Sequence, residues 1–85
     1  MIVVDANVIG KLFLEEDDSD TARAFIASVA QGGHRICAPT LLKLEVFAIA
    51  LHHGVDFDIP AALLQHLEDA VLTLVEPSPL LWQRA

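Results

Sequence analysis

Hydrophobic and polar positions follow two different spacings along the chain, and each change of spacing marks the boundary of an expected element. An apolar run at residues 2–4 ends in Asp5 and predicts a buried strand, and residues 35–38 and 72–75 predict two more. Between the strands, apolar residues recur every three to four positions, which predicts helices. The apolar faces of the first two expected helices are Val8, Ile9, Leu12 and Phe13, and then Ala22, Phe25, Ile26 and Val29.

The second helix has recognisable start and stop signals. The acidic run at residues 15–20 predicts a solvated turn leading into the helix, because carboxylates suit the positive end of a helix. Asp18 or Ser19 is a suitable N-cap, and Gly32-Gly33 ends the helix.

The third and fourth helices are bounded in the same way. Pro39 predicts a helix start close to it, and this helix runs to about His53, with Gly54 as its stop. Asp56 to Pro60 opens the fourth helix. Its expected apolar face is Leu63, Leu64, Leu67 and Val71.

The resulting order is strand, two helices, strand, two helices, strand and one further helix. This alternation predicts an α/β fold with a parallel sheet covered by helices and with right-handed crossovers. Ser78-Pro79 is suited to start a fifth helix, but only residues 80–85 follow it. We therefore expect a single domain at residues 1–85 that is incomplete at its C-terminus, with about three strands and four to five helices.

Composition narrows the class of protein. Hydrophobic residues make up 54% of 85 residues, so either the core is tightly packed or some apolar surface serves a partner. No apolar run approaches the roughly 18 residues of a membrane span, and an acid at position 5 leaves no visible secretory signal. The single Cys37 cannot form an internal disulfide. We expect a cytoplasmic protein, and its net charge of -7 is unfavourable for general binding to a phosphate backbone.

Two carboxylates stand out by their positions. Asp5 closes the first strand, and ligand sites in open parallel sheets lie outside such strand ends. Glu45 lies within the third helix, and its apolar neighbours one turn away predict that it shares the buried face. These neighbours are Leu41, Leu42, Ala48 and Ile49. A buried carboxylate must be neutralised by protonation, by a basic partner or by a cation, and Mg²⁺ suits a site with oxygen ligands.

Each acid also has an ordinary structural explanation. Asp5 alone is a suitable helix N-cap, and Glu45 alone could face solvent or form a buried salt bridge. The histidines show no metal-ligand spacing; they are His34, His52, His53 and His66.

The segments Val3–Val8 and Ala38–Val46 resemble the first half of a PIN domain, and the VapC-like toxin ribonucleases most of all. PIN domains are small α/β folds that cut single-stranded RNA with Mg²⁺ or Mn²⁺ held by a cluster of acids. The resemblance implies that Asp5 and Glu45 are catalytic, metal-binding acids and that Asn7 is a polar neighbour supporting Asp5. It also implies RNA as the substrate and an antitoxin protein as a partner.

The chain also departs from the family. The family's third acid lies in a later helix, and a further acid follows the next strand, but neither stretch occurs in these 85 residues. The later strands of the family flank the first strand, so we expect this strand to be an exposed apolar edge.

Two hypotheses follow from the resemblance to PIN domains and from the absence of the family's later acids. The chain is either part of a metal-dependent ribonuclease or an inactive remnant that pairs with a second copy or with an antitoxin-like protein. A phospho-acceptor receiver module is disfavoured, because Ala6 rather than a second acid follows Asp5 and no Asp lies in residues 72–75.

Overall fold

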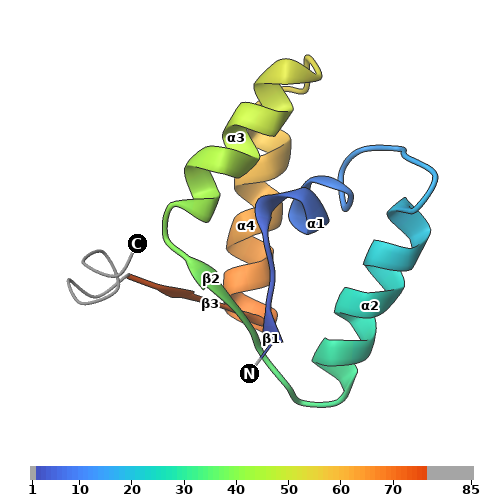
Figure 1. The fold of residues 1–85 in the computed structure, drawn as a ribbon, viewed down its shortest axis with the longest axis vertical. Helices are drawn as coiled ribbons and strands as arrows, with labels where there is room; N and C mark the ends of the chain where they lie inside the picture. Colours follow the sequence, from blue (N-terminus) through green and yellow to red (C-terminus); the bar gives the residue numbers. More distant parts are fainter. Residues whose placement is uncertain (1, 77–85) are drawn as a thin grey trace, which may run out of the picture.

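The computed structural model describes residues 2–76, which form an α/β fold of three strands and four helices (Figure 1). The elements in chain order are β1 (Ile2–Val3), α1 (Ala6–Gly10), α2 (Ser19–Gln31), β2 (Ile36–Pro39), α3 (Leu42–His52), α4 (Asp58–Ala70) and β3 (Leu72–Val75). The expected order is confirmed through β3, and the fifth helix expected after Ser78-Pro79 lies outside the described residues. Within residues 2–76, no helix has the length and apolar character needed to cross a bilayer.

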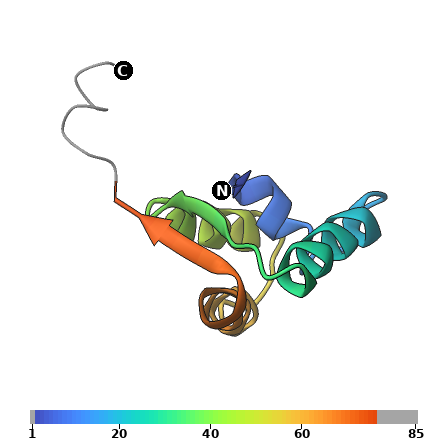
Figure 2. The same ribbon diagram turned by 90° about the horizontal axis from the view of Figure 1, so that it is seen from below.

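The sheet is parallel throughout, as expected, with β2 between β1 and β3. Alternate residues of a strand face opposite sides, so the register defines two rows. One row consists of Ile2, Ile36 and Leu72, and the other consists of Val3, Cys37 and Thr73. The helices gather on one side of the sheet (Figure 2). Ile36 and Leu72 are 0% and 1% exposed, which indicates that the first row faces the helices. Val3 on the other face is 72% exposed.

Each crossover contributes a helix face to one hydrophobic core. The largest buried side chains are Ile9, Ile36, Leu42, Val46, Val71 and Leu72. Leu64 and Leu67 of α4 belong to this core as predicted. On α2 the prediction is only partly correct, because Ala22, Ile26 and Val29 are buried but Phe25 is 39% exposed. Only a narrow stripe of α2 meets the core, and Phe25 lies beside this stripe.

Glycine ends both α2 and α3, as predicted. Gly33 has a φ of 73°, a left-handed conformation that glycine adopts without steric penalty. Its N–H donates to the Ala30 carbonyl, and the next N–H, of His34, donates to the Val29 carbonyl. These two bonds form a Schellman motif, and the same pattern ends α3 around Gly54.

Pro39 corrects the expected start of the third helix. It is the last residue of β2, in register with Val75, and α3 begins only at Leu42. The hydrogen bond that joins this end of β2 to β3 comes from the next residue, since the Thr40 N–H donates to the Val75 carbonyl at 3.2 Å.

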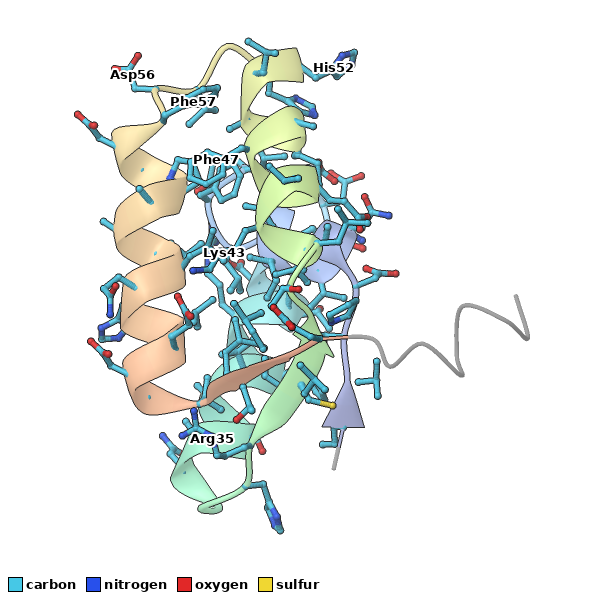
Figure 3. All side chains as sticks on the ribbon, turned by 90° about the vertical axis from the view of Figure 1, so that its left-hand side faces the viewer. Arg35, Lys43, Phe47, His52, Asp56 and Phe57 are labelled. Carbon is cyan, nitrogen blue, oxygen red and sulfur yellow. The ribbon has the colours of Figure 1, made fainter. Side chains whose placement is uncertain are left out.

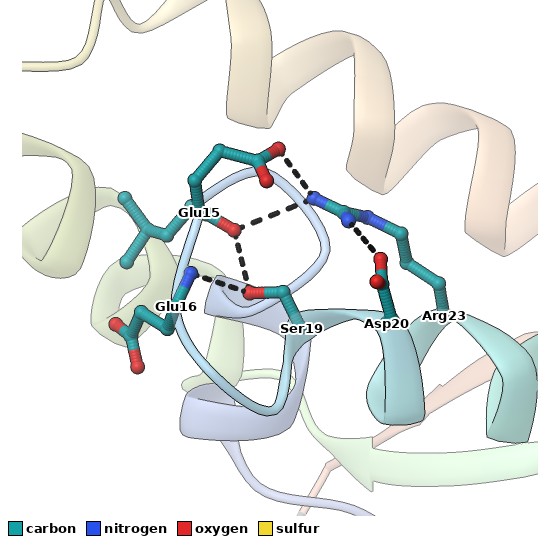
Figure 4. Close-up of polar contacts among 6 residues, drawn as sticks. Glu15, Glu16, Ser19, Asp20 and Arg23 are labelled. Carbon is teal, nitrogen blue, oxygen red and sulfur yellow. Dashed lines mark hydrogen bonds and ion pairs between the residues drawn. The ribbon is translucent and has the colours of Figure 1, made fainter.

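The acidic run forms a turn before α2, as expected, and Ser19 organises it (Figure 4). The Ser19 hydroxyl is buried, donates to the Leu14 carbonyl at 2.7 Å and accepts the Glu16 N–H at 2.9 Å. The Arg23 guanidinium closes the turn with ion pairs to Glu15 and Asp20. Ser19 therefore braces the loop from within rather than capping the helix.

Candidate functional site

Asp5 lies between β1 and α1 and is the N-cap of α1. Its Oδ1 accepts the backbone N–H of Asn7 at 3.0 Å and of Val8 at 3.2 Å. The residue is exposed, and no described residue forms an ion pair with it. Capping therefore fixes the orientation of the carboxylate. Its other oxygen, Oδ2, forms no hydrogen bond with any residue in the range 2–76.

Glu45 is exposed, which corrects the expectation that it shares the buried face of α3. The buried face consists of Leu42, Val46 and Ala50. Apolar residues surround almost the whole circumference of α3, so apolar neighbours do not identify the side that packs on the core. Leu41 and Ala48, two of the neighbours used for the prediction, are themselves exposed.

Asp5 and Glu45 nevertheless line the same hollow, which we call the acid depression. Its volume is about 370 Å³, and its remaining walls are Val3, Val4, Ala6, Pro39 and Leu42. The depression lies where β1 and β2 end and where α1 and α3 begin. The crossover topology therefore brings together two carboxylates that are far apart in the sequence, at the edge where open parallel sheets bind ligands.

No described Lys, Arg or His side chain forms an ion pair with Asp5 or Glu45. Each of the four Lys and Arg residues in residues 2–76 is already engaged elsewhere. Lys11 pairs with Asp18, Arg23 with Glu15 and Asp20, Lys43 with Glu68, and Arg35 with Thr73 and two carbonyls. The two carboxylates therefore make the acid depression a place of negative charge that favours a cation.

The donor set fits a hard divalent cation that keeps several of its waters. Mg²⁺ is commonly held by one or two carboxylates together with water and substrate oxygens, and Mn²⁺ accepts the same ligand types. Within residues 2–76 no three or more His, Cys, Asp or Glu side chains are grouped so that they could hold a metal ion. Asp5 and Glu45 would therefore supply two carboxylate ligands.

A second hollow, which we call the histidine depression, lies further along α1 and α3. Its volume is about 510 Å³. Its polar residues are Asn7, Lys11, Glu16, His52 and His53, and its apolar residues are Gly10, Leu14, Ala48 and Ile49. Figure 3 shows His52 near the end of α3 furthest from the sheet, on the side away from Phe47 and Phe57.

Asn7 lies between the two depressions. Its backbone N–H supports Asp5, while the residue lines the histidine depression and not the acid depression. The spacing of the histidines in the sequence does not indicate this hollow. The sequence indicates this hollow only through the spacing of residues on α3. Ala48, Ile49 and His52 follow Glu45 by three, four and seven positions, so they lie on the same side of the helix.

Lys11 and Asp18 form an ion pair at the rim of the histidine depression. The hydrogen bond from Lys11 lowers the pKa of Asp18 below its ordinary value. The same bond raises the pKa of Lys11. Lys11 therefore keeps its positive charge across the ordinary pH range, and a neighbouring acid already balances it.

The sequence matches no family model, and comparisons with curated proteins and with solved structures find no match. The residues and geometry of the chain therefore carry the functional assignment.

Proposed function

We propose that this protein is of the PIN type of metal-dependent ribonucleases, toxins that act on single-stranded RNA, and that Asp5 and Glu45 are two of the metal-binding acids that such a site needs. The observation that supports this most is the shared acid depression, where both carboxylates lie without a described basic partner. The three-stranded parallel sheet with flanking helices is compatible with a PIN-like fold. The segments Val3–Val8 and Ala38–Val46 supply the resemblance on which the family assignment rests.

The two acids have different supports, and both supports favour a fixed geometry. Two backbone N–H groups hold Asp5, so its carboxylate is oriented before any ligand arrives. Glu45 projects from the three-turn helix α3, whose buried face is anchored in the core. A divalent cation bound between them would activate water and offset the negative charge of a phosphate.

The direct test is cleavage of single-stranded RNA in Mg²⁺ by the wild type and by Asp5→Asn and Glu45→Gln. Asparagine also serves well as an N-cap, so Asp5→Asn removes the charge and preserves α1. We expect each substitution to lower the cleavage rate about a hundredfold or more, since metal ligation supports several kcal/mol of charge stabilisation. Mg²⁺ titration followed by amide chemical shifts should lose its response at the acid depression in both variants.

Asp58→Asn is the matched control, because Asp58 is an exposed acid in the first turn of α4 and lies outside both depressions. Its cleavage rate should equal that of the wild type. Equal rates in Asp5→Asn and the wild type, or no RNA cleavage by the wild type, would contradict the proposal.

A second candidate function is a non-catalytic module that pairs with another copy or with an antitoxin-like protein. Its specific support is an apolar stripe on the outer face of α3. The stripe consists of Leu41, Leu44 and Leu51, which are 51%, 67% and 70% exposed. Sedimentation of the wild type and of Leu44→Asp tests this function. Dimers that dissociate in the variant, with no Mg²⁺ response, favour the module, and a monomer that cleaves RNA favours the enzyme.

A further inference from the structure

We propose that the histidine depression binds a nucleobase of the RNA, next to the phosphate that lies in the acid depression. This inference rests on the proposed function and adds a base-recognition site to it. The depression has the volume of a small-ligand site, and both apolar and polar residues line it.

The two depressions lie along the same helix pair. Asp5 and Asn7 are two residues apart, and Glu45 and His52 lie two helical turns apart on the same side of α3. At 1.5 Å per residue, His52 is roughly 10 Å beyond Glu45 along the helix axis. A single strand that follows α3 with a phosphate at the acids therefore brings a neighbouring nucleotide to the histidine depression.

The chemistry of the lining favours a base over a phosphate group. Of the Lys, Asp and Glu side chains around the depression, Lys11 is already paired with Asp18, and Glu16 adds a negative charge. These three side chains leave no excess positive charge for an anion. A neutral, planar base instead has apolar walls at Ala48 and Ile49 and imidazole rings on which to stack.

Asn7 supplies the hydrogen-bonding groups that base recognition needs. Its side-chain amide has both a donor and an acceptor, which can pair with the edge of a base. Stacking on aromatic rings also provides RNA affinity that does not depend on positive charge. This matters in a chain of net charge -7 whose described Lys and Arg side chains are all engaged within the protein.

The test is metal-free titration of the isotope-labelled protein with AMP, GMP, CMP and UMP, followed by amide chemical shifts. At least one nucleotide should shift the amides of Asn7, Gly10, Ala48 and His52. Ala48→Phe fills the depression and His52→Ala removes a stacking ring, so each should weaken this binding about tenfold. The matched controls are Leu44→Phe on the outer face of α3 and His34→Ala after α2, and both should bind like the wild type.

Shifts at other residues, equal binding by His52→Ala and the wild type, or no binding of any nucleotide would overturn the proposal. RNA cleavage separates this failure from failure of the enzyme assignment. If the wild type cleaves RNA and His52→Ala keeps the same base preference next to the cut, the base site is wrong and the enzyme stands. If the wild type does not cleave RNA, the metal-free titration still decides whether the depression binds bases.

Discussion

Helix α3 has one flank that faces α4 and another that faces α1, and side-chain contacts fill the first more completely than the second. On the flank that faces α4, the rings of Phe47 and Phe57 meet edge to face with centroids 5.3 Å apart (Figure 3). Lys43 pairs with Glu68 across the same seam at 3.2 Å, and a hollow of only about 160 Å³ remains. The charged and aromatic groups on this flank find their partners within the protein.

The flank that faces α1 is open. Gly10 allows Ile49 to come close, since a Cβ at Gly10 would lie 3.2 Å from the Ile49 Cγ2. Beside this contact lie the acid depression and the histidine depression, where Asp5 and Glu45 have no described ion-pair partner. Charged and aromatic side chains of α3 thus stabilise the fold on the side of α4. On the side of α1, Glu45 and His52 line hollows that are open to a ligand.

The largest predicted effect concerns the buried residues between the two flanks. Leu42 is 1% exposed, and we expect Leu42→Ala to lower the free energy of unfolding by about 2–5 kcal/mol. Leu44 lies two residues further along the same helix and is 67% exposed, so Leu44→Ala should change it by about 0.5 kcal/mol or less. Urea unfolding measures both. Equal losses in the two variants would show that α3 has no preferred buried face.

A smaller effect tests the closed flank itself. A double-mutant cycle with Phe47→Leu and Phe57→Leu should give a coupling energy of about 0.5–1.5 kcal/mol from the edge-to-face contact. Phe25 on α2 provides the comparison, because Phe47→Leu and Phe25→Leu should be additive within about 0.5 kcal/mol. If the two cycles give the same coupling, the aromatic contact does not hold α3 against α4.

The smallest predicted effect is at the rim of the open flank and depends on pH. The lowered pKa of Asp18 means that its pair with Lys11 stabilises the fold above the ordinary Asp pKa. This stabilisation disappears as the pH falls through the lowered pKa. Thermal melts between neutral and strongly acidic pH should therefore show a steeper loss for the wild type than for Asp18→Asn. Parallel curves for the two proteins would exclude the pair as a source of acid sensitivity.

Much of the fold was predictable because the signals were local. Gly33 and Gly54 mark helix ends through their own backbone conformation, and β3 has the bounds predicted from its β-favouring residues. The helical spacing of the apolar residues in α4 also identified Leu64 and Leu67 as core residues. Each of these features depends on a few consecutive residues, so a single sequence contains the necessary information.

The candidate site was less predictable because it depends on which face of α3 packs inward. Leu42, Glu45 and Ala48 all lie on an almost uniformly apolar helix, and only contacts with α1, the sheet and α4 select the buried side. The sequence therefore identified Glu45 but assigned it to the wrong environment. The partners of Arg35 were equally hidden, since its bonds to Thr73 and to the Glu68 and Leu72 carbonyls join segments more than thirty residues apart.

The short elements around Asp5 have a consequence for the kinetics of the open flank. Asp5 joins a two-residue strand to a five-residue helix, whereas Glu45 belongs to the 11-residue helix α3. A helix as short as α1 has few internal hydrogen bonds, and segments of this kind open more readily than the whole molecule unfolds. The amide hydrogens of α1 should therefore exchange with solvent before those of α3, and any ligand that bridges the two acids should slow this exchange.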